Sequence, residues 1–222
     1  MICCEKIQFS YPGEAFQLSV DSFAVDHGEK VAIVGPSGCG KTTLLNLIAG
    51  ILEPQSGSVI TAGESIVEMK LQERQRFRIK KIGLVPQSFD LLDYLTVRDN
   101  IELPFRVSGE LVMTDEVSVR SKELAERAGI QDHLGKYPAQ LSTGERQRVS
   151  VCRSLIAGPR LILADEPTGN LDPENQDKIV SLLLEEAVRI DATVLMITHE
   201  PGLLGRFDRT VDVNELRGRG RA

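Results

Sequence analysis

The strongest constraint on this chain is one eight-residue stretch, Gly-Pro-Ser-Gly-Cys-Gly-Lys-Thr at positions 35–42. It matches the pattern G-x-x-x-x-G-K-[ST] of a phosphate-binding loop without a gap. The apolar residues 30–34 before it predict a short buried strand, and residues 43–49 after it predict a helix that ends at Gly50. Strand, glycine-rich loop and helix form the context in which this motif folds. The sequence therefore predicts an α/β core with a phosphate site.

The residue types of the loop suit a nucleotide. Glycines let backbone N–H groups converge on a phosphate, and the helix N-terminus behind the loop adds partial positive charge. We expect Lys41 to contact the β- and γ-phosphates and the hydroxyl of Thr42 to bind Mg²⁺. A turn that only caps a helix would not need lysine and threonine at these positions. The expected nucleotide contacts of this stretch are Gly35, Pro36, Ser37, Gly38, Cys39, Gly40, Lys41, Thr42 and Thr43.

Composition narrows the class of protein. The 222 residues suffice for one core with a smaller subdomain attached. The net charge of −6 disfavours a general nucleic-acid binder, which would be basic. No run of 18 apolar residues predicts a membrane span, and the N-terminus lacks the pattern of a signal peptide. If the protein acts at a membrane, we expect another chain to cross it.

The four cysteines predict neither a disulfide framework nor a zinc site, because none forms a C-x-x-C pair. Reduced thiols in a cytosolic protein are the better interpretation. Cys39 lies inside the phosphate loop and is either oxidation-sensitive or a small filler; the filler is favoured, since nothing indicates a depressed thiol pKa. The arginines at 217, 219 and 221 predict a solvated tail.

Turn signals and periodicity predict three parts. Residues 2–11 and 16–25 alternate in polarity and meet at Pro12-Gly13, which predicts an antiparallel pair. Strands over 58–61, 82–86, 161–166, 193–198 and 211–213 alternate with helices, and residues 70–81 predict a solvated helix. Three helices, after Thr96, over 115–128 and from about Ser142, predict an inserted helical subdomain at about 87–157. The ATP-binding core would then comprise residues 1–86 and 158–222.

Four polar residues directly follow predicted strands: Gln87, Asp165, Glu166 and His199. In an open parallel sheet, ligands bind at the carboxyl ends of the strands, so we expect these residues on the rim that holds the phosphate loop. Asp165 would partner Mg²⁺ beside Thr42, and Glu166 would polarise a water against the γ-phosphate. His199 could hold that water, and Gln87 could sense the metal. A lone glutamine or histidine at a strand end is more often structural, whereas adjacent Asp-Glu is rarely accidental here.

Further motifs resemble one family. The run Leu141-Ser142-Thr143-Gly144-Glu145-Arg146-Gln147-Arg148 resembles the signature of ABC ATPases, and residues 165–172 resemble their Walker B and D-loop run. Over essentially its whole length the chain is similar to the ATP-binding subunit of an ABC transporter. The Gly-Asn-Leu-Asp form at 169–172 and the residues at 91–104 are similar to the macrolide-exporter and lipoprotein-releasing branch (MacB/LolD-like), with FtsE proteins nearby.

The resemblance implies a fold and a chemistry. The fold is a P-loop NTPase parallel-sheet core with an N-terminal antiparallel β subdomain and an inserted α-helical subdomain; the ligands are ATP and Mg²⁺. Residue by residue, it implies that Tyr11 stacks on adenine, a role that its position alone leaves balanced against that of an edge aromatic. It also implies that Gln87 is the Q-loop residue and His199 the switch histidine. Thr143 replaces the first of the two successive glycines that are usual in the signature. We expect this replacement to retune the ATP contact without abolishing it.

The resemblance also implies partners. Ser142 and Gly144 would contact the ATP of a second subunit, giving a homodimer closed through ATP, and an integral-membrane permease would hold the subunit peripherally on the cytoplasmic face of the membrane. No nucleic-acid partner is expected. Two alternatives stay open: an FtsE-like regulatory ATPase that signals without transport, and a non-transport ABC protein acting on nucleic acid. The permease would recognise the transported substrate, so the sequence of this chain does not identify that substrate.

Overall fold

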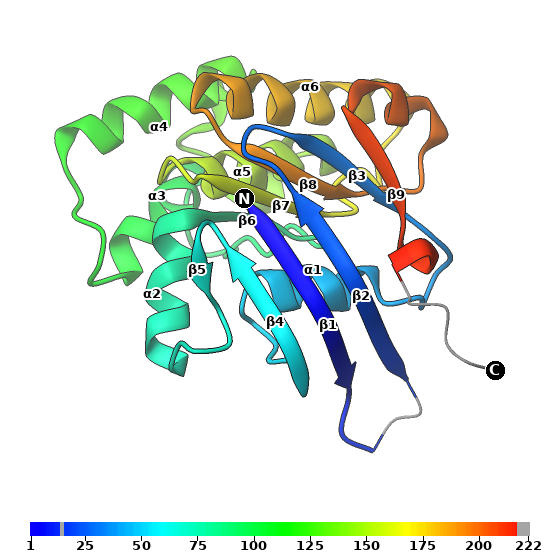
Figure 1. The fold of residues 1–222 in the computed structure, drawn as a ribbon. Helices are drawn as coiled ribbons and strands as arrows, with labels where there is room; N and C mark the ends of the chain where they lie inside the picture. The colour runs from blue at the N-terminus through cyan, green and yellow to red at the C-terminus, as the bar shows by residue number, and fades with distance from the viewer. Residues whose placement is uncertain (14–15, 217–222) are drawn as a thin grey trace.

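A five-stranded parallel sheet forms the centre of the protein in a computed structural model, which describes residues 1–13 and 16–216 (Figure 1). Its strands, in spatial order, are β6 (Ile82–Val85), β7 (Leu161–Asp165), β8 (Thr193–Ile197), β3 (Lys30–Val34) and β9 (Arg209–Asp212). The predicted strands are confirmed, with the last one at the edge beside β3. Arg217, Arg219 and Arg221, expected in a solvated tail, lie outside the described residues.

A second, antiparallel sheet has the order β2-β1-β4-β5. It comprises β1 (Ile2–Ser10), β2 (Gln17–Val25), β4 (Ser56–Thr61) and β5 (Glu64–Ser65). The predicted pairing of the first two strands is confirmed, with Ile2 opposite Val25. β4 joins β1 with a register shift between Glu5 and Gln8. At this shift the backbones of β1 and β4 approach so closely that a Cβ on Gly57 would lie 2.5 Å from the Glu5 carbonyl oxygen.

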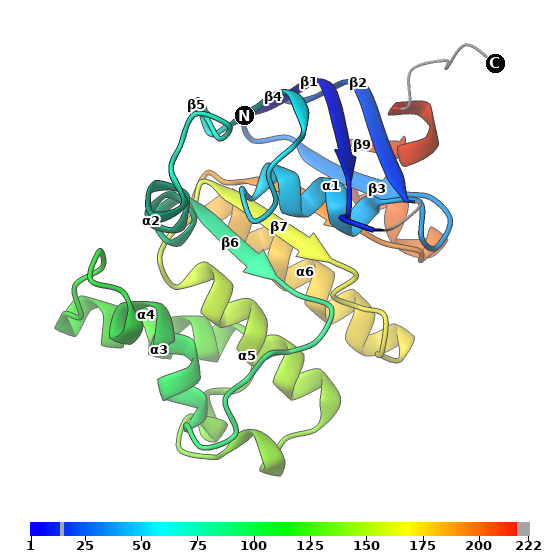
Figure 2. The ribbon, with the colours of Figure 1, turned by 90° about the horizontal axis from the view of Figure 1, so that it is seen from below.

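The helices cover both faces of the parallel sheet (Figure 2). Helix α1 (Lys41–Ile48) lies between the two sheets, and α5 (Thr143–Leu155) and α6 (Pro173–Arg189) lie on the opposite face. The alternation along β7 explains this layering: Leu161 and Leu163 belong to the core shared with α1, whereas Ile162 and Ala164 belong to the core shared with α5 and α6. A parallel sheet covered on both faces needs such apolar strands.

Between β6 and β7 the chain is helical, as predicted. It forms α3 (Val97–Val107), α4 (Asp115–Arg127), two short 3₁₀ turns at Gln131–His133 and Pro138–Gln140, and α5. Further 3₁₀ turns lie at Pro201–Arg206 and Val213–Leu216. Whether this helical block is a subdomain with limits near 87 and 157 stays a prediction.

Helix α2 (Leu71–Lys81) corrects one expectation in part, since most of its residues are exposed as predicted. The sequence predicted a solvated helix, but Arg74 and Phe77 are buried on its inner face. Arg74 forms an ion pair with Glu53 at 2.9 Å.

In the described residues no helix combines the length and apolar character needed to cross a membrane. Cys4 and Cys152 are free thiols, and burial raises the pKa of each to about 12.

Candidate active site

The parallel strands bring the expected polar residues to one edge of the sheet. The phosphate loop follows β3, Gln87 comes two residues after β6, Asp165 ends β7, and His199 comes two residues after β8. β7 and β8 are in register, with Asp165 opposite Ile197. Segments far apart in the chain therefore meet at the carboxyl edge, as the strand-end pattern predicted.

The phosphate loop has the glycine conformations that such a loop requires. Gly35, Gly38 and Gly40 have φ values of 148°, 75° and 102°. Gly40 caps α1, and a Cβ there would lie 2.9 Å from the ring of Phe16. The side chain of Lys41 is 5% exposed, and its Nζ donates to the carbonyl oxygens of Gly35 and Pro36, both at 2.9 Å. These bonds hold the ammonium group within the loop.

Thr42 and Asp165 form a pair of oxygen ligands beside the loop. The hydroxyl of Thr42 donates to Oδ1 of Asp165 at 3.2 Å. Burial raises the pKa of Asp165; the hydrogen bond from Thr42 opposes this rise, the charge of Glu166 adds to it, and the charge of Lys41 also opposes it. A hydroxyl and a carboxylate fit Mg²⁺, which binds proteins through one or two such oxygens and completes its shell with waters and phosphates.

Glu166, which directly follows β7, is held in place by its neighbours. Its φ of 43° is unusual for a residue other than glycine. Backbone bonds from its N–H to Ile197 O and from Gly169 N–H to its carbonyl, both at 3.1 Å, fix this turn. Its Oε1 lies 2.7 Å from Nε2 of His199, and its Oε2 accepts from Nε2 of Gln87 at 3.3 Å. Gln87, Glu166 and His199 thus form one contact group.

Tyr11 borders the same cleft. Its hydroxyl lies 3.2 Å from Oγ1 of Thr43, and its ring stands edge-on to Phe9 at a centroid distance of 4.9 Å. The cleft, of about 390 Å³, also contacts the phosphate loop, Gln87 and Glu166. Phe16 lines it as well, with its ring centroid 5.9 Å from that of Tyr11. Sequence reasoning missed Phe16, since its place in the alternation of residues 16–25 indicated only a core position.

The signature residues do not reach this cleft. Ser142 and Gly144 lie at the start of α5, outside the residues that line it. Gly144 is buried against α6, where a Cβ would lie 2.8 Å from Oδ1 of Asn175. Close packing of the two helices is therefore one reason for this glycine, beyond the approach to phosphate that the sequence suggested. Thr143 is exposed in the first turn of α5.

Comparisons with known proteins agree with this geometry. A family model described as ABC transporter matches residues 18–169. An uncharacterized ABC transporter ATP-binding protein of Mycobacterium tuberculosis is 42% identical over 192 residues, covering 86% of this chain and 77% of that protein. The lipoprotein-releasing system ATP-binding protein LolD of Chromohalobacter salexigens is 36% identical over 220 residues, covering 98% of this chain and 92% of LolD.

The solved structures extend the match to the whole fold. The dimeric post-hydrolysis structure of the ATP-binding cassette MJ0796, bound to ADP and phosphate, superimposes with a TM-score of 0.87 at 30% sequence identity. The superposition covers 99% of this chain and 97% of that one. The fold expected from the motifs is thereby confirmed, and the chain belongs to the ABC transporter family.

Proposed function

We propose that this chain is the ATP-hydrolysing subunit of an ABC transporter and drives a separate membrane permease. The observation that carries the proposal is the contact group of Gln87, Glu166 and His199 beside a complete phosphate loop. In phosphoryl transfer, a protein mainly positions the reacting groups and stabilises their charge. Glu166, held from two sides, is suited to orient and polarise the attacking water, and His199 to hold that water near the γ-phosphate.

The other residues of the cleft would bind the substrate. Tyr11 offers a ring for adenine, and Lys41 and the loop N–H groups face the phosphates. Thr42, Asp165 and Gln87 are the candidate ligands of Mg²⁺, which when bound neutralises charge on the β- and γ-phosphates. Because Ser142 and Gly144 lie outside this cleft, we infer that they act on the ATP of a second copy of the chain. This makes the working form a dimer closed through two nucleotides.

The permease would dock beside the loop that follows Gln87. This loop is anchored to α5, since Arg153 donates to the carbonyl oxygens of Phe89 at 2.8 Å and Asp90 at 2.6 Å. Tyr94 on the same loop is 75% exposed. This loop would therefore link Gln87, at the metal site, to a partner protein that contacts its exposed residues. Such a partner would keep the chain at the cytoplasmic face of a membrane.

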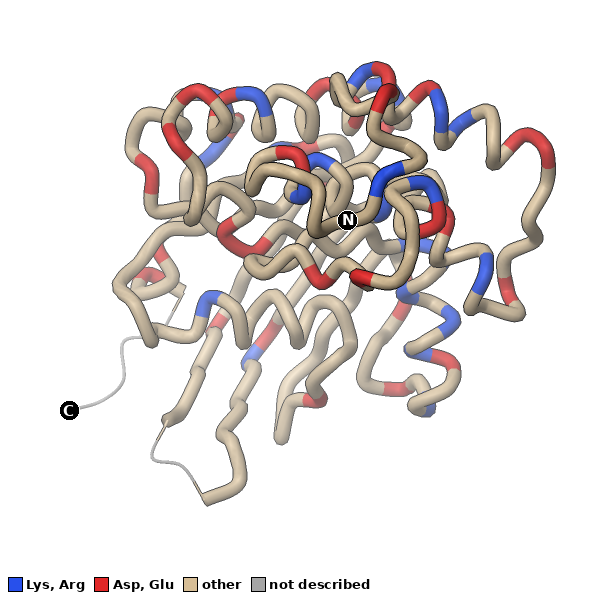
Figure 3. Tube along the Cα trace, turned by 180° about the vertical axis from the view of Figure 1, so that it is seen from behind, with Lys and Arg blue, Asp and Glu red and all other residues tan. Residues whose placement is uncertain are grey.

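Along the chain, Lys and Arg are interspersed with Asp and Glu (Figure 3). This mixture of charges does not favour a nucleic-acid partner.

Glu166→Gln tests the proposal. Loss of the base should lower ATP turnover by about 10²–10⁴-fold, while ATP binding stays intact and an ATP-bound dimer accumulates in size-exclusion chromatography. Glu185→Gln, at an exposed position of α6, is the matched control and should retain full turnover. Near-wild-type turnover of Glu166→Gln would contradict the assignment of the base.

The membrane role needs its own test. Affinity purification from native membranes followed by mass spectrometry should recover an integral-membrane permease, and Tyr94→Ala should reduce that recovery. ATP-driven substrate flux in vesicles would then separate transport from signalling. Recovery of nucleic acid without any membrane protein would contradict the proposal.

A further inference from the structure

A chain of hydrogen bonds leads from His133 to the signature serine. Nε2 of His133 lies 2.9 Å from Oε1 of Glu145. The other oxygen of that carboxylate, Oε2, accepts from the Ser142 hydroxyl at 2.8 Å and from the Ser142 backbone N–H at 2.7 Å. His133 closes the 3₁₀ turn after α4, and its side chain is 21% exposed. His133 and Ser142 thus share the carboxylate of Glu145.

The direction of the first bond follows from the charge of Glu145. The backbone N–H and the hydroxyl of Ser142 hold the pKa of Glu145 below its usual range; burial opposes them, and His133 adds a smaller lowering effect. The carboxylate is therefore ionised at neutral pH and only accepts hydrogen bonds. Nε2 of His133 must then carry the hydrogen. Its Nδ1 is buried and has no hydrogen-bond partner among the described residues.

The pair Ser142–Glu145 alone already makes a capping box at the start of α5. His133 is not needed for that cap, but it changes the carboxylate in two ways. It restricts the rotation of the Glu145 side chain, and so the orientation of the Ser142 hydroxyl. It also donates a hydrogen bond to a negative charge that lies at a helix N-terminus expected to receive a phosphate, which lessens the repulsion between the two anions.

We propose that His133 is a positioning residue for Ser142, acting through Glu145, in the contact with the partner subunit's nucleotide. The inference rests on the proposed function, because Ser142 matters to hydrolysis only if the dimer forms. His133 itself would touch no nucleotide. It lies outside the cleft around Lys41, so ATP binding by a single subunit should not depend on it.

The test uses the full chain in the Glu166→Gln background, where the ATP-bound dimer accumulates. His133→Leu removes the donor, and His133→Phe removes it while keeping a ring in place, in case the smaller aliphatic side chain impairs folding. His133→Gln keeps an N–H donor. We expect the Leu and Phe variants to weaken ATP-dependent dimerisation about tenfold, the scale of a lost hydrogen bond to a charged group. The Gln variant should restore it, and the affinity of the monomer for MgATP should stay unchanged in all three.

The controls separate this inference from the function on which it rests. His27→Leu removes a histidine that lies 3.8 Å from Asp191, away from the signature, and should dimerise normally. Ser142→Ala should abolish dimerisation. If Ser142→Ala does so while His133→Leu and His133→Phe dimerise like the parent, the role of His133 is overturned and the proposed function stands. If Ser142→Ala also dimerises normally, the contact in trans itself is wrong. If His133→Gln fails along with the Leu and Phe variants, the donor is not what matters, and the inference fails.

Discussion

Glu166 adopts a backbone conformation that costs stability in order to place its side chain. A non-glycine residue in the left-handed region carries a penalty on the order of 1–3 kcal/mol, and here φ is 43°. The bonds to Ile197, His199 and Gln87 hold the turn against that penalty. Strain of this kind is typical of residues whose position is set by chemistry rather than by packing.

Lys41→Ala should weaken ATP binding itself, in contrast to Glu166→Gln. It removes the full positive charge of the cleft together with two bonds that order the loop. Hydrogen bonds to charged groups contribute about 1.5–3 kcal/mol, so we expect at least a tenfold rise in the Kd of ATP. Titration calorimetry would measure it. Lys178→Ala, which loses only an exposed pair with Glu174, should bind ATP normally. Equal Kd values for the two variants would speak against a phosphate contact at Lys41.

Asp165→Asn should stabilise the nucleotide-free protein and abolish Mg²⁺-dependent turnover. The folded-state pKa of Asp165 is raised by burial, so the native state binds this proton more readily than the unfolded state. The wild type therefore loses stability as pH rises above the ordinary aspartate value of about 3.9. Asparagine carries no charge and can still accept from Thr42. Thermal melts should show a higher melting temperature for the variant at pH 7 and a difference that shrinks towards pH 4. A difference that grows on acidification would contradict this sign.

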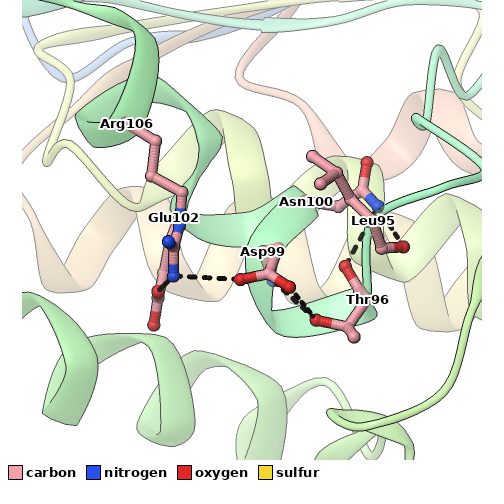
Figure 4. Close-up of polar contacts among 6 residues, drawn as sticks. All are labelled: Leu95, Thr96, Asp99, Asn100, Glu102 and Arg106. Carbon is pink, nitrogen blue, oxygen red and sulfur yellow. Dashed lines mark hydrogen bonds and ion pairs between the residues drawn. The ribbon is translucent and has the colours of Figure 1, made fainter.

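At the scale of elements, polar side chains of α3 hold the end of the loop that precedes this helix (Figure 4). Thr96 caps α3, accepting from the backbone N–H of Asp99. The side-chain amide of Asn100 donates to the carbonyl oxygens of Leu92, Leu95 and Thr96, and its oxygen accepts from Leu92 N–H. Glu102 pairs with Arg106 one turn later. The loop after Gln87 is thereby tied to α3 as well as to α5.

Asn100→Ala should destabilise the fold by about 2–4 kcal/mol, because the backbone N–H of Leu92 and the carbonyl oxygen of Leu95 lose their bonds to this side chain. Asn100 is 0% exposed, so truncation leaves the polar partners of its amide facing the space that the side chain fills. Chemical denaturation would measure the change in free energy of unfolding. Asn100→Asp keeps the shape and the acceptor but loses the amide donor, and we expect it to be nearly as damaging. A near-neutral Asn100→Asp would show that the donor contributes little.

At the scale of the whole molecule, the two halves of the expected catalytic apparatus lie apart. The cleft around Lys41 contains the phosphate loop, Gln87 and Glu166 but neither Ser142 nor Gly144. The dimeric MJ0796 cassette, which superimposes over nearly the whole chain, shows that this fold can pair. If Ser142 and Gly144 act on the ATP of a second copy, as proposed, the single subunit is an incomplete enzyme, since groups supplied in trans contribute about 10³–10⁵ in rate in other phosphoryl-transfer enzymes.

Specific ATPase activity should therefore rise with protein concentration through the range in which dimers form. A steady-state assay over a wide dilution series would measure it, with Ser142→Ala as a variant expected to stay low throughout. Activity per subunit that is constant across the dimerisation range of the wild type would argue that one copy suffices.

The amino-acid sequence by itself determined the phosphate loop, the strands that precede the polar residues and the starts of α3 and α5, because these depend on a few neighbouring residues and on periodicity. It also predicted that Gln87, Asp165, Glu166 and His199 share an edge, since parallel strands place their carboxyl ends together. The roles of these residues in catalysis stay predictions.

Only the tertiary structure decided which distant residues touch. Asn175 against Gly144 and His133 on Glu145 bring together residues from different elements. So does the burial of Arg74 in a helix that looked solvated. No local pattern carries this information, because such contacts depend on how every strand and helix between the two residues packs. Periodicity tells which face of an element is buried, and only the assembled fold determines what that face meets.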